Sequence, residues 1–161
     1  MKKLVAYITT SFPNNDFTVD LAYSLKNSGV DTLELGIPFS DPVADGPTIE
    51  KANLKALENG FKLEDLFEIS SKIGKDIDTL WMGYANPFYH YGLEEFLKKA
   101  KEYNIAGTII PDLPFEMAQK YSDLYEKYSR VNITFVAPTT AKDRIKMLVE
   151  NSQKFIYMVA Y

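Results

Sequence analysis

The sequence predicts an α/β fold in which short parallel strands alternate with helices. Three observations support this prediction: segments rich in β-branched and aromatic residues, apolar residues at helical spacing between them, and a steady alternation of the two patterns. Such alternation is typical of crossover units, whose helices cover a parallel sheet. The six expected strands cover residues 4–9, 32–37, 79–84, 107–110, 132–136 and 155–161.

Five helices are expected between these strands, because five stretches carry apolar residues at the spacing of one helix face. Pro at a first helical position and Gly just past a helix end mark the bounds of the second of these. We expect the aromatic stretch 86–92 to be a loop. The five helical stretches contain Phe17, Leu21 and Leu25; Pro47 to Gly60; Leu63, Leu66, Phe67 and Ser70; Leu93, Phe96, Leu97 and Ala100; and Ile145, Leu148 and Val149.

Six strand–helix units are fewer than the eight that close a (βα)8 barrel, also called a TIM barrel. The sequence also stops within an apolar strand at 155–161, which would leave a hydrophobic edge exposed. We therefore expect residues 1–161 to form a single TIM-barrel domain with about six of the eight units, truncated before strands 7 and 8. An open half-barrel is the alternative.

Composition narrows the classes of function. The net charge is -4 with the two signs interspersed, so we expect no nucleic acid and no membrane partner. Cysteine is absent and His90 is the single histidine, so we expect no structural metal and no catalytic histidine. The first residues have the pattern of a strand and not of a signal peptide, which favours the cytoplasm.

Two carboxylates, Glu34 and Asp45, stand out in an otherwise apolar, turn-rich segment. Alternation along the strand places Glu34 opposite the bulky Leu33 and Leu35, hence inside a barrel if helices cover the aliphatic face. Burial would raise the pKa of Glu34 toward the range of proton transfer at neutral pH. A structural ion pair or a hydrogen bond to a backbone amine is the alternative. Asp45 lies just before Pro47, so the following helix is expected to hold its position.

The same segment resembles a known family. LELGIPFSDP at residues 33–42 and ADGPTI at 44–49 closely resemble the signature of the tryptophan synthase alpha subunit. Weaker similarities run along the rest of the chain, so the resemblance covers essentially all 161 residues. They are AYIT at 6–9, MGYANP at 82–87, PDLP at 111–114 and FIY at 155–157.

The resemblance implies an activity and a partner. The activity is the reversible retro-aldol cleavage of indole-3-glycerol phosphate to indole and glyceraldehyde 3-phosphate, a carbon–carbon lyase reaction of tryptophan biosynthesis. It implies Glu34 as the acid/base and Asp45 as the group that contacts the indole N–H. No cofactor is expected on this chain, since pyridoxal phosphate belongs to the beta subunit of an alpha2-beta2 heterotetramer. The phosphate-binding residues are expected beyond residue 161.

The resemblance also implies residues around the substrate and the partner, although apolar side chains at such positions commonly belong to the core. Asp112 is a possible polar pocket residue, and a turn-stabilising role is the alternative. The expected partner contacts are Asp41, Pro42, Asn86 and Pro87. The expected pocket residues are Tyr7, Met82, Tyr84, Ile109, Phe135 and Tyr157.

Two other classes of function stay open at this point. One is a catalytically inactive barrel that binds and activates a partner, which salt-bridged carboxylates would favour. The other is a different phosphate-handling barrel enzyme, such as a sugar-phosphate isomerase or aldolase. A Schiff-base aldolase requires an inward lysine, and Lys3 and Lys154 both precede the strands nearest to them.

Overall fold

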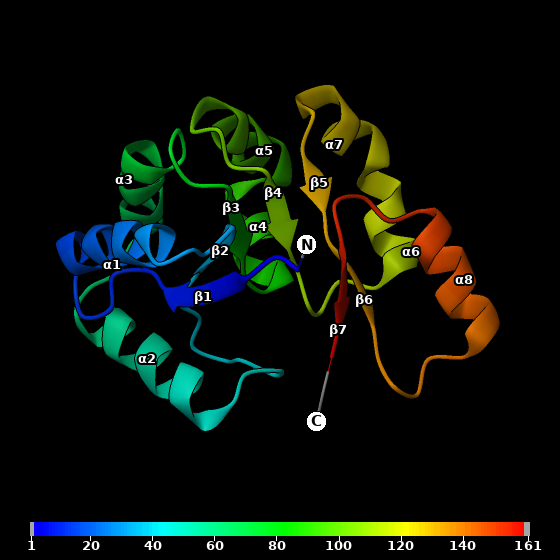
Figure 1. Ribbon diagram of the computed structural model, residues 1–161, viewed down its shortest axis with the longest axis horizontal. Coiled ribbons are helices and arrows are strands. Elements are labelled where there is room, and N and C mark those ends of the chain that lie inside the picture. The colour runs from blue at the N-terminus through cyan, green and yellow to red at the C-terminus, as the bar shows by residue number, and fades with distance from the viewer. Residues whose placement is uncertain (1, 160–161) are drawn as a thin grey trace.

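Five parallel strands in chain order form the larger sheet of the computed structural model, which describes residues 2–159 (Figure 1). Each strand pairs with the next in the order β1-β2-β3-β4-β5, as expected for right-handed crossover units. The expected parallel α/β architecture of a partial barrel is confirmed. The strands are β1 Val5–Thr9, β2 Thr32–Gly36, β3 Thr79–Met82, β4 Gly107–Ile109 and β5 Val131–Asn132.

The expected strand at 132–136 is divided in the structure. Its first part is β5, which pairs with β4, and its second part is β6 (Thr134–Val136), which pairs with β7 (Ile156–Met158). Ile133 joins the two parts, and its N–H still bonds the Thr108 carbonyl at 2.9 Å. The division arises because the hydrogen-bonding partner of this segment changes from β4 to β7 along its length. Of the expected last strand, residues 160 and 161 lie outside the described part of the chain.

Helices cover one face of the larger sheet (Figure 1). The five helices expected from the apolar stripes are confirmed, and the last of them packs against β6. No helix within residues 2–159 is long and apolar enough to cross a membrane. The confirmed helices are α1 Asn15–Asn27, α2 Pro47–Glu58, α3 Leu63–Ile73, α5 Leu93–Glu102 and α8 Lys142–Glu150.

The remaining helices are short and were not predicted. The prediction of a loop at residues 86–92 was wrong, because the helix α4 (Ala85–Tyr91) covers most of this stretch. Pro87 is tolerated there since it lies in the first turn, where its missing N–H costs no helical bond. The buried Phe88 anchors the helix, which ends before Gly92 at a φ of 100°. The other short helices are α6 Phe115–Ala118, η1 Gln119–Tyr121 and α7 Ser122–Tyr128.

Alternation along the strands separates two groups of apolar side chains. On β2 and β3, Leu33, Leu35 and Trp81 belong to the larger cluster, which includes helix residues. Leu80, one position from Trp81, belongs to the smaller cluster on the opposite face. Glu34 is in register with Leu80, so it lies on the inner face as expected. The smaller cluster consists of Leu80, Ile109 and Ile133, with Met82, Ala106, Val131, Phe135, Phe155 and Tyr157 packed against it.

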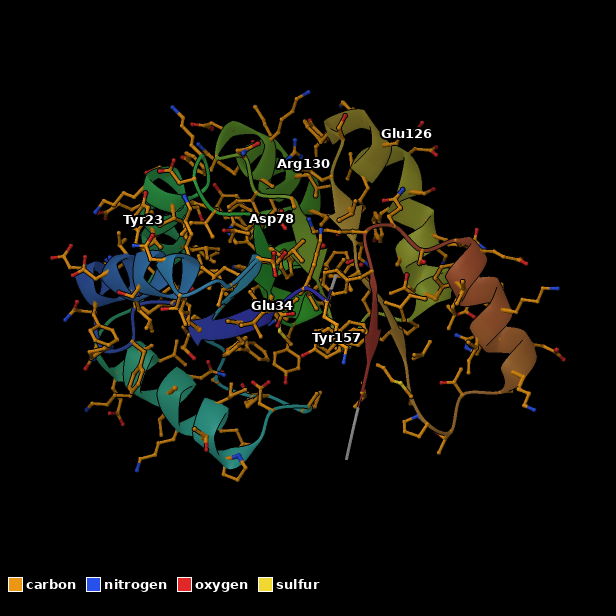
Figure 2. All side chains as sticks on the ribbon, in the orientation of Figure 1. Tyr23, Glu34, Asp78, Glu126, Arg130 and Tyr157 are labelled. Atoms are coloured by element: carbon orange, nitrogen blue, oxygen red, sulfur yellow. The ribbon has the colours of Figure 1, made fainter. Side chains whose placement is uncertain are left out.

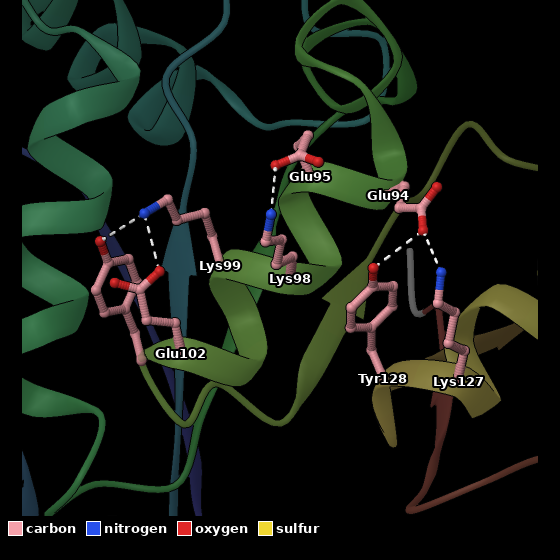
Figure 3. A network of polar contacts seen from close by, with 8 residues as sticks. Glu94, Glu95, Lys98, Lys99, Glu102, Lys127 and Tyr128 are labelled. Atoms are coloured by element: carbon pink, nitrogen blue, oxygen red, sulfur yellow. Dashed lines mark hydrogen bonds and ion pairs between the residues drawn. The ribbon is translucent and has the colours of Figure 1, made fainter.

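A polar network on the surface joins α5 to α7 (Figure 3). Glu94 at the start of α5 accepts hydrogen bonds from Lys127 Nζ at 2.6 Å and from Tyr128 Oη at 3.0 Å. Lys99 of α5 pairs with Glu102 at 2.9 Å within the same helix. The charged ends of these side chains are open to solvent, so water screens each pair and its contribution to stability is small. The apolar contacts beneath them therefore dominate the packing of these helices.

The structure predicts a large difference between two leucines on neighbouring helices. Leu66 on α3 is fully buried, whereas Leu54 on α2 is 58% exposed. We expect Leu66→Ala to lower the free energy of unfolding by about 2–5 kcal/mol, because it leaves a cavity, and Leu54→Ala to change it by about 0.5 kcal/mol or less. Urea unfolding of both variants measures the difference. Equal losses would contradict this placement of the core.

Candidate active site

Glu34 is a buried carboxyl group in the middle of a parallel sheet. It lies on β2 between Tyr7 of β1 and Leu80 of β3, and only 3% of its surface is exposed. Burial raises the pKa of Glu34 from 4.5 to about 7, and desolvation is the only cause of this shift. The ion pair considered as an alternative is not present among residues 2–159. Glu34 can therefore both hold and release a proton near neutral pH.

A cavity of about 310 Å³ lies beside Glu34, between β1 and β7. Figure 2 shows Glu34 and Tyr157 in this region. Both side chains line the cavity, and burial raises the pKa of Tyr157, with a smaller contribution in the same direction from Glu34. The cavity is lined by Val5, Tyr7, Glu34, Phe155, Ile156, Tyr157 and Met158.

Asp45 lies in the loop that connects β2 to α2. Its carboxylate accepts a hydrogen bond from Nδ2 of Asn53 on α2 at 3.1 Å. Burial raises the pKa of Asp45, and the nearby Tyr84 hydroxyl and Asn53 amide partly offset that effect. The environment of Asp45 is therefore polar as well as partly buried, which favours the ionised form more than the environment of Glu34 does.

Tyr84 holds the loop that carries Asp45. It lies just before α4, and its hydroxyl oxygen accepts a hydrogen bond from the Ala44 backbone N–H at 2.9 Å. The Tyr84 ring also packs against Phe39, with ring centroids 5.4 Å apart. A side chain that follows β3 thus fixes the backbone of the loop that follows β2.

Tyr7 lies near both carboxyl groups. Burial raises its pKa to about 12, and the charges of Asp45 and Glu34 add smaller contributions in the same direction. Its ring lies directly against Gly36, where any Cβ would overlap the Tyr7 side chain. The absence of a side chain at position 36 therefore creates the space that Tyr7 occupies.

The other four expected pocket residues lie in or against the smaller cluster, which is the apolar cluster on the inner face. Met82, Ile109, Phe135 and Tyr157 all belong to the inner cluster, in which the rings of Phe135 and Tyr157 are 5.1 Å apart. The structure thus brings these four together on the face that carries Glu34. Their contact with substrate stays a prediction.

Asp112 has a structural hydrogen bond. Its Oδ1 accepts from the backbone N–H of Ala85 at 2.8 Å, so it joins the loop after β4 to the start of α4. It also lines a cavity of about 490 Å³ between α6, α7, β6 and α8, which contains neither Glu34 nor Asp45. This hydrogen bond joins two segments far apart in the chain and does not lie within the turn of Asp112, so the polar pocket role and the turn-stabilising alternative both stay predictions.

The expected partner contacts lie in two segments that follow neighbouring strands: Asp41 and Pro42 in the loop after β2, and Asn86 and Pro87 in the first turn of α4 after β3. Asp41 and Asn86 are exposed, whereas Pro42 and Pro87 are half-buried. These segments follow the carboxyl ends of β2 and β3, and Ile37 N–H bonds the Met82 carbonyl at 2.7 Å where the strands end. The four residues therefore belong to the same end of the sheet as Asp45.

Sequence reasoning missed Asn53. The sequence feature that could have revealed it is its place on α2: Asn53 is a polar residue three positions before the buried Ala56, hence on the same buried face of the helix. It also missed the cavity near Asp112, because its walls come from short helices that carry no clear apolar stripe.

The fold and the site define the class of this protein. Parallel strands with covering helices, and polar side chains at the carboxyl ends of the strands, are the features of (βα)8-barrel proteins. Residues 1–161 match the family model described as tryptophan synthase alpha chain. The chain belongs to this family, which confirms the resemblance carried by residues 33–49.

Related proteins agree with this assignment. The tryptophan synthase alpha chain of Wolinella succinogenes is 55% identical over 161 residues, which are 100% of this chain and 63% of that protein. The structure of tryptophan synthase subunit alpha from Campylobacter jejuni has a TM-score of 0.90 at 38% identity, over 99% of this chain and 64% of that one. A tryptophan synthase complex from Pyrococcus furiosus has a TM-score of 0.91 at 32% identity, over 97% and 65%. This chain thus spans less than two thirds of each relative.

The raised pKa of Glu34 predicts a pH-dependent stability. The folded chain keeps the Glu34 proton until about pH 7, whereas the ordinary pKa is 4.5, so the stability associated with the neutral form is lost as the pH rises from 4.5 through 7. We expect Glu34→Gln to be more stable than the wild type at about pH 8 and similar to it at about pH 4. Urea midpoints at both pH values test this. A difference that does not change with pH would contradict the raised pKa.

The contact between Tyr7 and Gly36 predicts a coupled pair of substitutions. Gly36→Ala should destabilise the chain by about 1–3 kcal/mol, because the added methyl group displaces the Tyr7 ring. The same substitution in a Tyr7→Ala background should cost much less, since the obstructing ring is gone. A double-mutant cycle of unfolding free energies measures this coupling. Additive losses would show that Tyr7 does not occupy this space.

Proposed function

We propose that this chain carries the alpha reaction of tryptophan synthase, the reversible retro-aldol cleavage of indole-3-glycerol phosphate to indole and glyceraldehyde 3-phosphate. Membership of the family supports the reaction class. The observation that carries the proposal is the buried, unpaired Glu34 with a pKa of about 7, close to Tyr7, which also lies near Asp45.

The reaction needs three things that this arrangement can supply. A proton must reach the indole ring carbon that loses its side chain, and another must leave the side-chain hydroxyl group as the carbon–carbon bond breaks. Glu34 suits this proton transfer because its pKa lies near neutral pH. The indole nitrogen becomes positively charged in the intermediate, and the carboxylate of Asp45 would stabilise that charge. We propose no cofactor for these steps.

The substrate proposal places the flat indole ring among apolar side chains of the inner face. Tyr7 and Tyr157 line the cavity beside Glu34, and Met82, Ile109 and Phe135 lie in the adjoining inner cluster. Tyr84 would border this slot on the side of Asp45. Aromatic walls can pack against a planar aromatic ligand in stacked or edge-to-face geometry.

We also propose a beta subunit as the partner of this chain, in an alpha2-beta2 assembly with pyridoxal phosphate on the partner and indole as the transferred product. The similarity to the Pyrococcus furiosus tryptophan synthase complex supports this proposal. The exposed Asp41 and Asn86, with Pro42 and Pro87, are the proposed contacts, because the loop after β2 and the start of α4 lie at the end of the sheet that carries Asp45. The proposed compartment is the cytoplasm.

The activity is tested by indole release from indole-3-glycerol phosphate. We expect Glu34→Gln to reduce the rate by about a hundredfold or more, because it removes the group that transfers protons. The folded structure should persist, since glutamine fills the same space without a buried charge. The rate of the wild type should rise when the beta subunit is added.

A matched control is Glu58→Gln on α2, which removes an exposed carboxylate that pairs only with Lys55. Its rate should equal that of the wild type. Near-normal release by Glu34→Gln would remove Glu34 from the mechanism. Binding of the beta subunit with no release by the wild type would instead support an inactive barrel that activates its partner.

A further inference from the structure

Asn53 is a buried amide with an incomplete set of hydrogen bonds. Its side chain is 2% exposed, and it shares the buried face of α2 with Ala56. Nδ2 donates to Asp45 at 3.1 Å, whereas Oδ1 has no hydrogen-bond partner among residues 2–159. A buried carbonyl without a partner lowers stability, so packing alone does not account for an asparagine here. The contact with Asp45 is the one interaction that its amide makes.

The helix that carries Asn53 is fixed at its C-terminal end. Asn59, just after α2, donates from Nδ2 to the Pro13 carbonyl at 3.0 Å, which joins the end of the helix to the loop after β1. The Phe61 N–H bonds the Ala56 carbonyl at 3.0 Å and closes the same end. The Asn53 amide is therefore presented to Asp45 from a regular helix that is tied to a neighbouring loop.

Two contacts divide the task of fixing this loop. Tyr84 holds the backbone through the Ala44 N–H, and Asn53 holds the carboxylate of Asp45. The Tyr84 hydroxyl also stabilises the ionised Asp45 carboxylate, so loss of the amide would leave that carboxylate with one donor in place of two and free to change its orientation. The orientation of the amide also depends on charge, since a reversed amide would bring two oxygen acceptors together unless Asp45 were protonated.

We propose that Asn53 is a positioning residue for Asp45, which its amide holds ionised and in one orientation toward the candidate active site. The consequence for catalysis rests on the proposed function, but the contact itself does not. Three other ionisable groups face Asp45 and stay the same in the test. They are Glu50 of α2, Tyr84 before α4 and Tyr7 of β1.

The test replaces Asn53 by leucine, which has a similar size and no donor. We expect the pKa of Asp45 to rise by about one unit, because a hydrogen bond to its ionised form is lost. Carbon-13 NMR of aspartate-labelled protein follows this titration, with the Asp45 signal assigned from its absence in Asp45→Asn. The urea midpoint should stay the same or rise, since the buried unpartnered carbonyl is removed as well. A purely structural role predicts a lower midpoint.

The effect on turnover is measured in parallel. Asn53→Leu should lower kcat for indole release about tenfold and shift the pH profile in the same direction as the Asp45 titration, with a smaller effect on KM. Asn151→Leu is the matched control, because it removes an exposed amide donor just after α8, where Nδ2 contacts the Met147 carbonyl at 2.8 Å, and plays no part in holding α2 or Asp45. It should leave both the titration and the pH profile unchanged.

The titration needs no substrate, so it separates this inference from the proposed function. A wild type that releases no indole would overturn the proposed function, while the Asp45 titration would still decide the role of Asn53. An unchanged Asp45 pKa in Asn53→Leu would overturn the inference. If that variant does not fold, Asn53→Ala removes the same donor and is expected to give the same shift.

Discussion

The strand alternation of β2 is the constraint on which the site depends. Leu33 and Leu35 belong to the core beneath the helices, so Glu34 between them must lie on the opposite, inner face. A shift of one residue would place a carboxyl group in the helix–sheet core and two leucines on the inner face. The apolar packing of the outer face thus fixes the direction of the Glu34 side chain. The burial of Glu34 on the inner face in turn raises its pKa.

The loops at the carboxyl ends of the strands are positioned by contacts between neighbours. The ladder continues past the strand ends, where the Thr10 N–H bonds the Gly36 carbonyl and the Gly83 N–H bonds the Ile109 carbonyl, both at 3.0 Å. Beyond this ladder, Asp112 in the loop after β4 accepts a hydrogen bond from Ala85 at the start of α4, which follows the neighbouring strand β3. Each loop is therefore supported by the unit beside it, which suits a site built from several strand ends.

The two carboxyl groups differ because their surroundings differ. Glu34 is affected by desolvation alone, whereas the burial of Asp45 is partly offset by Tyr84 and Asn53. Environments that separate the pKa values of two nearby acids allow one to exchange protons while the other stays charged. This separation comes from the location of each group, one within the sheet and one on a loop, and not from any difference in side-chain chemistry.

The sequence by itself determined the parallel α/β fold, the five longer helices, the inward Glu34 and the family, because periodicity and a specific motif are local properties of the chain. Only the tertiary structure decided that β5 and β6 separate at Ile133, that residues 85–91 form α4, and that Asp112 bonds Ala85. It also decided that Asn53 reaches Asp45. These features depend on contacts between segments that are far apart in the sequence. The periodicity of apolar residues predicts a helix or a strand, but it does not predict which segments meet.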